Sequence, residues 1–492
     1  MHRIPVESEG LMVRTTRRLG FSDLGLRFWL ASLGFGSYWA WIDSAFFTTV
    51  LFGSFPDVAR VASESHIVAQ VAAIAITCIC MAVSRTAPHL FAKEKAFALV
   101  AGIGTCGTIL SFFSIKQGSG ILFFAASLML GVAMGALPLF WGTLLARDEQ
   151  GKAALKVCGS IAIACAATVL LSYVETFGRL LITCCLLPFG LLCFAIMTQN
   201  VSDLQTETCG SQKSRKLRTF WRLLLALLAS SFAFGSLQSS YHDFWLDFNL
   251  ITQIQIIGRG AVAFMVLLAA GFFGRSYRIV YRAGLLLMIA AFLATPFLAS
   301  SLPYFGGILV SMGYSCVELM MWTFAFEAIR QEAKPAFTIG FLRVIMMSGV
   351  LAGILTTPSL IGSPLTDDVR YAIGTTTIAY ILVMSLMLLV DEQNPRGFWN
   401  AMNRSAFVSH EEALLSRCKA VSRQYELTDR EAEVMRYLVA GRSAPFIANE
   451  LFIAPSTVKY HTARLYSKLD VHSKQELIDL FERFETEPKH RT

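Results

Sequence analysis

The chain has 492 residues, of which 55% are hydrophobic and 15% are charged, whereas soluble domains carry about 25% charged residues. This composition excludes an ordinary soluble globular protein and predicts a membrane protein with a smaller soluble part. The formal net charge of +8 matters through its distribution, because loop charge sets membrane orientation and tail charge sets affinity for phosphate.

The eleven cysteines lie mostly inside apolar stretches, where cysteine packs as a small hydrophobic side chain. The sequence contains neither a zinc-spaced Cys/His set nor a Cys-x-x-Cys pair. We therefore expect reduced, structural cysteines, no metal site and no cofactor. No set of catalytic residues stands out, and we expect that the protein is not an enzyme.

Residues 1–25 form a polar segment that contains Arg3, Arg14, Arg17 and Arg18. The apolar run that follows is too long for a secretory signal peptide and has no small-residue cleavage site. We therefore expect this segment to stay attached to the chain, on the cytoplasmic side.

Between Leu26 and Val390 the sequence contains twelve apolar stretches that are long enough to cross a bilayer as helices. The first six lie near 27–52, 66–84, 96–115, 120–146, 154–174 and 179–198. After a polar, basic stretch at 199–219, six more lie near 220–241, 252–274, 281–300, 304–326, 337–357 and 371–390. Residues 26–390 are thus predicted to form an all-α, polytopic bundle with two sets of six spans.

The loops between these spans differ in their content of Lys and Arg, which concentrate in short loops on the cytoplasmic side. If the amino end is inside, the inside loops hold most of these residues: Arg85, Lys93 and Lys95; Arg147, Lys152 and Lys156; Lys213, Arg215, Lys216, Arg218 and Arg222; Arg275, Arg278 and Arg282; and Arg330, Lys334 and Arg343. The outside loops hold only Arg60, Lys116, Arg179 and Arg370. The alternation predicts that both termini are cytoplasmic.

This six-plus-six arrangement with a basic central loop resembles the major facilitator superfamily, whose two halves form a cavity at the bilayer midplane. The usual loop signature of that superfamily, glycine with an Asp-Arg pair and further basic residues, is absent from 84–90. Only 271–275, Gly-Phe-Phe-Gly-Arg, is faintly similar to it. The absence argues against transport, because in transporters that loop helps to control the switch between inward-open and outward-open states.

Ionisable residues inside spans are costly and usually face a cavity or a partner. In a facilitator-like fold the first, seventh, eighth and tenth spans border the central cavity, and a ligand pocket is predicted from Asp43, Gln238, Arg259 and Glu318. The alternative is that Arg259 neutralises Asp43 or Glu318 and so holds the halves together. In that interpretation Trp39 and Trp41 are interfacial anchors.

Residues 391–424 are predicted to form a short linker that contains Pro395 and a run of mixed charge. No receiver-like acidic domain or ATPase loop lies between the spans and the tail. We therefore expect any signal to originate in the membrane half or in a protein bound to it.

The tail, residues 425–486, is predicted to form four short helices. Thr428 and Glu431 have the spacing of a capping box, and Gly441 ends the first helix. Ser443 caps a second helix, in which Pro445 falls within the first turn, where its missing N–H costs nothing.

Pro455 starts a third helix that runs to about Leu469, and Ser473 caps a fourth. The short turn between the second and third helices is typical of a helix-turn-helix. Val458 and Leu465 anchor the third helix, and its exposed sides present hydroxyl, cationic and aromatic groups that predict contact with DNA: Ser456, Thr457, Lys459, Tyr460, His461, Arg464 and Lys468. Among these, Lys459, Arg464 and Lys468 are predicted to contact phosphates.

The tail resembles the LuxR-type (GerE-like) DNA-binding domain through L-T-x-R-E-x-E-V, T-V-K-x-H, Y-x-K-L and S-x-x-E-L, over some 57 residues. The family usually has Asn at 444 and Ser at 454, where this chain has Ala444 and Ala454. The resemblance implies a bacterial regulator that binds double-stranded DNA, with the fourth helix helping two domains to pair.

Three functions remain open from the sequence. The first is a one-component regulator in the inner (cytoplasmic) membrane, in which a small molecule or membrane signal acts on the spans and changes how the tails bind promoter DNA. The second is a secondary transporter with a regulatory domain attached. The third is a scaffold that holds DNA at the membrane without sensing.

Overall fold

The structure is a computed structural model that describes residues 25–47, 58–147, 152–199, 221–240, 248–273, 277–298, 302, 305–332, 335–360, 368–390, 418, 421–422, 424–439, 443–451, 453–473, 476–477 and 480. These residues contain helices and turns and no β-strand. The chain divides into two compact units, Met1–Glu392 and Gln393–Thr492.

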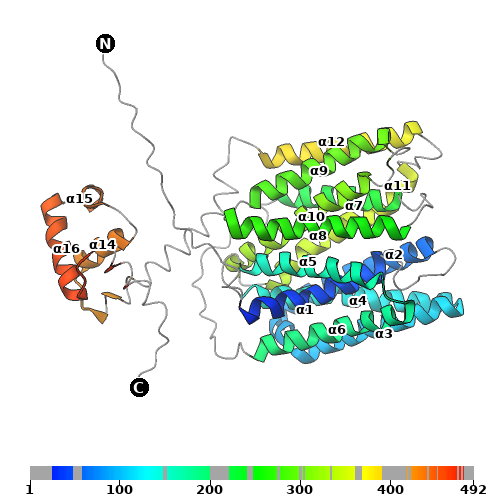
Figure 1. Cartoon of the computed structure of the whole chain (residues 1–492), viewed down its shortest axis with the longest axis horizontal. Helices are drawn as coiled ribbons and strands as arrows, with labels where there is room; N and C mark the ends of the chain where they lie inside the picture. Colours follow the sequence, from blue (N-terminus) through cyan, green and yellow to red (C-terminus); the bar gives the residue numbers. More distant parts are fainter. Residues whose placement is uncertain are drawn as a thin grey trace, which may run out of the picture. The chain divides into compact units, whose positions relative to one another are not determined.

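The described residues of the first unit form twelve α-helices in two sets of six. They are α1 (Leu26–Ile42), α2 (Val58–Thr86), α3 (Glu94–Gln117), α4 (Gly120–Leu145), α5 (Lys152–Leu171), α6 (Thr176–Gln199), α7 (Trp221–Ser240), α8 (Phe248–Phe273), α9 (Tyr277–Leu298), α10 (Phe305–Glu332), α11 (Pro335–Leu360) and α12 (Asp368–Val390). Figure 1 shows them running side by side along a common direction. A π-helical turn, η2 (Asp43–Phe47), follows α1, and a 3-10 turn, η3 (Pro88–Ala92), precedes α3.

Helices form here because backbone polar groups inside a bilayer must be satisfied within the protein. Nine of the described helices are long and apolar enough to cross a membrane, and α8 and α9 contain the shorter apolar stretches Gln253–Leu268 and Arg282–Leu298. The predicted all-α, polytopic bundle is therefore confirmed. The protein is a multi-pass membrane protein.

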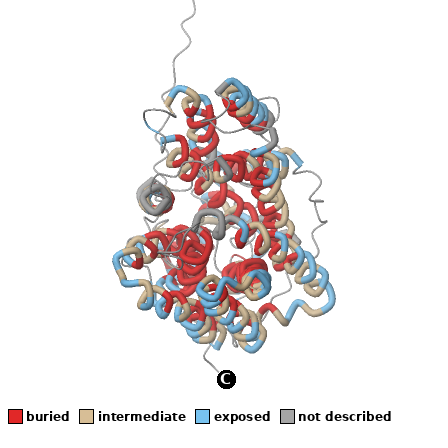
Figure 2. Tube along the Cα trace, turned by 90° about the vertical axis from the view of Figure 1, so that its right-hand side faces the viewer, coloured by how far each residue is buried: buried red, intermediate tan, exposed pale blue. Residues whose placement is uncertain are grey.

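Burial in this unit increases towards the interior of the bundle (Figure 2). Large apolar side chains such as Ile121 and Phe297 are exposed. An apolar exterior is what lipid contact requires. Where α7 and α11 cross, small residues let the backbones touch: a Cβ at Gly235 would overlap the backbone of Val350.

Two tryptophans of α1 lie in the interior rather than at a membrane surface. Trp39 is 5% exposed and Trp41 is fully buried, and Trp41 Nε1 donates a hydrogen bond to Thr108 Oγ1 at 2.9 Å. The interpretation of these two residues as interfacial anchors is therefore wrong.

The second unit contains α14 (Asp429–Val439), α15 (Ala444–Leu451) and α16 (Pro455–Leu469). The capping box is confirmed: the Thr428 N–H donates to Glu431 Oε2 at 2.9 Å, and the Glu431 N–H donates to Thr428 Oγ1 at 3.4 Å. Pro445 falls within the first turn of α15, as predicted.

These helices pack on one apolar core. Its buried members include Val434, Leu438, Ile447, Val458, Leu465, Leu469 and Leu477. Of the predicted fourth helix the structure describes few residues, among them Ser473, whose Oγ accepts a hydrogen bond from the Glu476 N–H at 3.1 Å. Gly441 lies outside the described residues.

Candidate DNA interface and membrane cavity

Helix α16 buries one side and exposes the other. Val458 and Leu465 are fully buried in the core, which confirms them as the anchors of the helix. Five of the residues predicted to contact DNA are exposed: Ser456, Lys459, Tyr460, Arg464 and Lys468. The other two, Thr457 and His461, are half-buried. The 3.6-residue period of the helix places the buried and exposed sets on different sides.

Aromatic rings support the cationic side of α16. The Arg464 guanidinium lies 5.6 Å from the centre of the Tyr460 ring, and the rings of Tyr460 and His461 meet edge to face at 5.6 Å. A cation stacked on a ring loses little conformational freedom when it meets a phosphate. Arg464 is thus held at the surface in a conformation that can bind an anion.

Lys468 differs from the other cations because it binds within the domain. Its Nζ donates hydrogen bonds to Glu431 Oε2 at 2.8 Å and to the Glu426 carbonyl at 2.9 Å. The contact fastens the carboxyl end of α16 to the start of α14. A phosphate contact by Lys468 stays a prediction, and the structure gives this residue a second, stabilising role.

Burial acts to raise the pKa of Glu431, but hydrogen bonds from Lys468 and Thr428 outweigh it and hold the pKa at about 2. The carboxylate therefore remains ionised at neutral pH.

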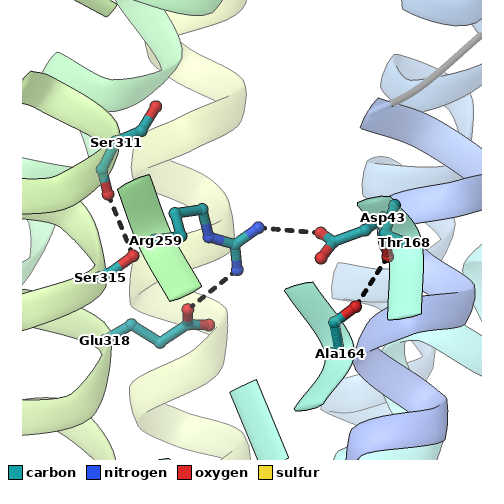
Figure 3. Close-up of polar contacts among 7 residues, drawn as sticks. All are labelled: Asp43, Ala164, Thr168, Arg259, Ser311, Ser315 and Glu318. Carbon is teal, nitrogen blue, oxygen red and sulfur yellow. Dashed lines mark hydrogen bonds and ion pairs between the residues drawn. The ribbon is translucent and has the colours of Figure 1, made fainter. Parts of the chain in front are cut away.

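In the membrane unit, Arg259 of α8 lies between two carboxylates. Its Nη1 is 2.8 Å from Asp43 Oδ1, and its Nη2 is 3.5 Å from Glu318 Oε2 (Figure 3). Asp43 begins the π-helical turn after α1, and Glu318 belongs to α10. The Arg259–Asp43 ion pair therefore joins the first six helices to the second six.

All three side chains of this triad are buried. Removing one partner of a buried ion pair leaves an uncompensated charge and costs about 3–5 kcal/mol. A π-helical turn often marks a functional position, because its widened backbone redirects a side chain. Here the turn carries Asp43, the member of the triad that comes from the first six helices.

A cavity of about 70 Å³ lies between the two sets of helices. Its polar lining consists of His66, Gln70, Arg259, Tyr314, Glu318 and Arg343, and the remaining wall is mostly apolar or aromatic. The predicted pocket residues Arg259 and Glu318 line this cavity, whereas Asp43 and Gln238 do not. Within the described part of the chain, no group of three His, Cys, Asp or Glu residues could hold a metal ion.

Residues 425–481 match the family described as bacterial regulatory proteins, luxR family. These residues form a LuxR-family helix-turn-helix domain. The LuxR-family domain is 52% identical over 48 residues to the probable transcriptional regulatory protein NarL of Mycobacterium tuberculosis, covering 10% of this chain and 22% of that protein. It is 42% identical over 59 residues to the Fimbriae Z protein of Escherichia coli K12, covering 12% of this chain and 28% of that protein. The chain thus spans only about a quarter of the length of these curated relatives.

The membrane unit has the fold of major facilitator transporters. It is similar to the human organic anion transporter MFSD10, with a TM-score of 0.51, 14% identity and coverage of 74% of this chain and 97% of that chain. It is also similar to a bacterial homologue of the iron transporter ferroportin, with a TM-score of 0.52, 13% identity and coverage of 75% and 98%. Identities this low establish the fold alone.

Arg343 lines the cavity but is not among the pocket residues predicted from the sequence. The loop-charge pattern assigns Arg343 to an inside loop, whereas Arg343 lies within α11 and is 6% exposed. The apolar residues around it are the available signal, because a cation at the ninth residue of a membrane helix is costly and usually functional. Tyr314, Trp39 and His66 also line the cavity, and no local pattern distinguishes them from packed aromatic residues.

Proposed function

We propose that the chain is a membrane-embedded, one-component transcription regulator. The observation that carries this proposal is that one chain contains both a LuxR-family domain with an exposed α16 and a polytopic bundle of the major facilitator fold. A DNA-binding domain tied to a membrane bundle can pass a membrane event to a promoter without a separate kinase or diffusible partner.

In this proposal the LuxR-family domain binds promoter DNA through α16. Ser456 and Thr457, at the amino end of the helix, meet base edges in the major groove, as in other helix-turn-helix proteins. Lys459 and Arg464 contact phosphates, which position the domain and make binding dependent on salt. Two domains pair on the DNA through the segment that follows Ser473.

The membrane unit supplies the signal. A small molecule in the cavity binds one arrangement of the two sets of helices more tightly than another, since only differential affinity can shift a conformational equilibrium. The Arg259–Asp43 ion pair joins the two sets. It stabilises an arrangement in which it forms relative to one in which it is broken. Asp43 therefore belongs to the sensing machinery even though it does not line the cavity.

We place the protein in the bacterial inner membrane with both termini cytoplasmic. The uneven content of Lys and Arg in the loops supports this orientation. It also leaves the LuxR-family domain in the compartment that contains the chromosome.

Chromatin immunoprecipitation with the intact, tagged protein tests this function. The protein should be recovered from the membrane fraction and enriched at a small number of promoters, and Lys459→Ala combined with Arg464→Ala should abolish that enrichment. Arg430→Ala is the matched control, because Arg430 is an exposed cation that pairs with Glu433 on α14. Equal enrichment of the double variant and the wild type would contradict the proposed role of α16.

A second candidate, a secondary transporter with an attached regulatory domain, is favoured by the fold of the membrane unit. Reconstituted vesicles separate the two functions. Accumulation of a substrate driven by an ion gradient supports the transporter, whereas binding without accumulation supports the sensor.

A further inference from the structure

Two opposite charges face the cavity without contacting one another. Arg343 lies over the Trp39 ring, 5.8 Å from its centre, and no carboxylate of the described residues lies within 4.0 Å of its nitrogens. Glu318 Oε2 is 3.5 Å from Arg259 Nη2, which is longer than a charge-assisted hydrogen bond. Within the described residues, Glu318 Oε2 and Arg343 Nε are buried atoms with no hydrogen-bond partner.

Two further polar groups of the lining are unsatisfied in the same way. Gln70 is 2% exposed; its Nε2 donates to the Met347 carbonyl at 3.2 Å, and its Oε1 has no donor among the described residues. Trp39 Nε1 is likewise a buried donor with no acceptor in the described part of the chain. A buried polar group without a hydrogen-bond partner is unfavourable. A ligand that forms hydrogen bonds with these groups would therefore gain affinity for the cavity.

The size and the apolar wall of the cavity limit that occupant. A water molecule needs about 10–15 Å³ of cavity volume. The cavity of about 70 Å³ therefore accommodates roughly six non-hydrogen atoms. Met346, Met347 and Val350 of α11 supply an apolar surface. Phe234 and Tyr314 stack with ring centres 4.0 Å apart and also line the cavity.

We infer that the cavity binds a small zwitterion of the amino-acid type. Its carboxylate is held by Arg343 and Trp39 Nε1, its ammonium group by Glu318 and Gln70 Oε1, and its short apolar side chain by the α11 wall. The inference rests on the proposed sensing function and names the class of ligand for the same cavity.

Charge balance selects a zwitterion over a simple ion. Two guanidinium groups, Arg259 and Arg343, and two carboxylates, Asp43 and Glu318, lie at or beside the cavity. A ligand without net charge preserves this balance, whereas an added anion or cation leaves one buried charge uncompensated. The ligand would also bridge both sets of helices, because Trp39 and Gln70 come from the first set and Glu318 and Arg343 from the second.

The test is the thermal unfolding of the purified full-length protein in nanodiscs, followed by tryptophan fluorescence. The probes are L-alanine, propionate, which lacks the ammonium group, and ethylamine, which lacks the carboxylate. At about ten times its Kd, L-alanine should raise the unfolding temperature by roughly 2–4 °C, and the other two should leave it unchanged. Stabilisation by propionate equal to that by L-alanine, or no stabilisation by any probe, would overturn the inference.

Variants locate the effect in the cavity. Arg343→Gln and Glu318→Gln should each remove the stabilisation by L-alanine, whereas Arg85→Gln, which changes an exposed cation stacked on Phe337, should retain it. If Arg343→Gln does not fold, the comparison of the three probes on the wild type still decides. Promoter enrichment without a response to L-alanine would overturn the ligand class alone. A response to L-alanine without promoter enrichment would leave the ligand class standing and contradict the proposed function.

Discussion

At the scale of single residues, Glu431 connects the capping of one helix to the attachment of another. Its carboxylate accepts hydrogen bonds from the Thr428 N–H and from Lys468 Nζ, at 2.9 and 2.8 Å. The carboxylate is almost fully buried, and the lysine is one-third exposed. The contact therefore combines a helix cap with a partly screened ion pair.

Replacing Lys468 with methionine should lower the free energy of unfolding of residues 393–492 by about 1–2 kcal/mol, because the buried carboxylate loses a charged donor. Urea denaturation followed by circular dichroism measures this change. Lys459→Met is the control, since Lys459 is an exposed cation on the same helix. Equal stability of the two variants would show that the Lys468 contact is not stabilising.

The same pair makes the stability of this unit depend on pH. The pKa of Glu431 is about 2 in the folded domain and 4.5 without its partners. Because the folded pKa is lowered, the stabilisation is complete above pH 4.5 and is lost as the pH falls towards 2. The wild type should therefore lose more stability than Lys468→Met between pH 5 and pH 2, and parallel losses in the two proteins would contradict this assignment.

The residues of the two candidate sites were predicted from the sequence to different extents. Local patterns predicted the exposed side of α16 and the capping box, because helix periodicity and a three-residue spacing are visible in the sequence. The Lys468–Glu431 ion pair joins residues 37 positions apart, and the cavity depends on which helices are neighbours. Neither is encoded in a local pattern, which is why Arg343 was misplaced.

At the scale of secondary structure elements, α16 begins without a side-chain cap. Ala454 occupies the cap position in an extended conformation and makes no side-chain hydrogen bond to the first turn. Serine at this position should increase the free energy of unfolding by about 1 kcal/mol. Thermal denaturation of Ala454→Ser beside Ala463→Ser, which alters an exposed position within the same helix, measures the effect of the cap. A similar change in stability in Ala454→Ser and Ala463→Ser would exclude a stabilising effect of the cap.

The membrane helices were predictable as elements because each must present about 20 apolar residues to the hydrocarbon. Their ends were less predictable. The span expected near 27–52 is α1 to Ile42, followed by the π-helical turn at Asp43–Phe47, and no hydropathy pattern distinguishes such a turn from a continuing helix. It is this turn that carries Asp43, the partner of Arg259.

At the scale of the whole molecule, the proposed function requires that the membrane unit controls the LuxR-family domain. Asp43→Asn removes one carboxylate from the triad and costs about 3–5 kcal/mol of stability, while Glu318 stays beside Arg259; recovery of the variant from the membrane fraction checks that it folds. We expect transcription of the bound genes to stop responding to growth conditions, while promoter enrichment persists. We would measure those transcripts in the Asp43→Asn strain under different growth conditions, with Arg85→Gln as the control. A normal response in the Asp43→Asn strain would remove the triad from the sensing mechanism.

The proposed function depends on DNA binding by α16 while its domain remains part of a membrane protein. The most direct measurement is the affinity of the full-length protein in nanodiscs for an enriched promoter fragment, as a function of salt concentration. We expect the logarithm of the affinity to fall linearly with the logarithm of the salt concentration, and we expect Arg464→Ala to reduce the slope by about one. The absence of any binding to that fragment at low salt would contradict DNA binding by α16.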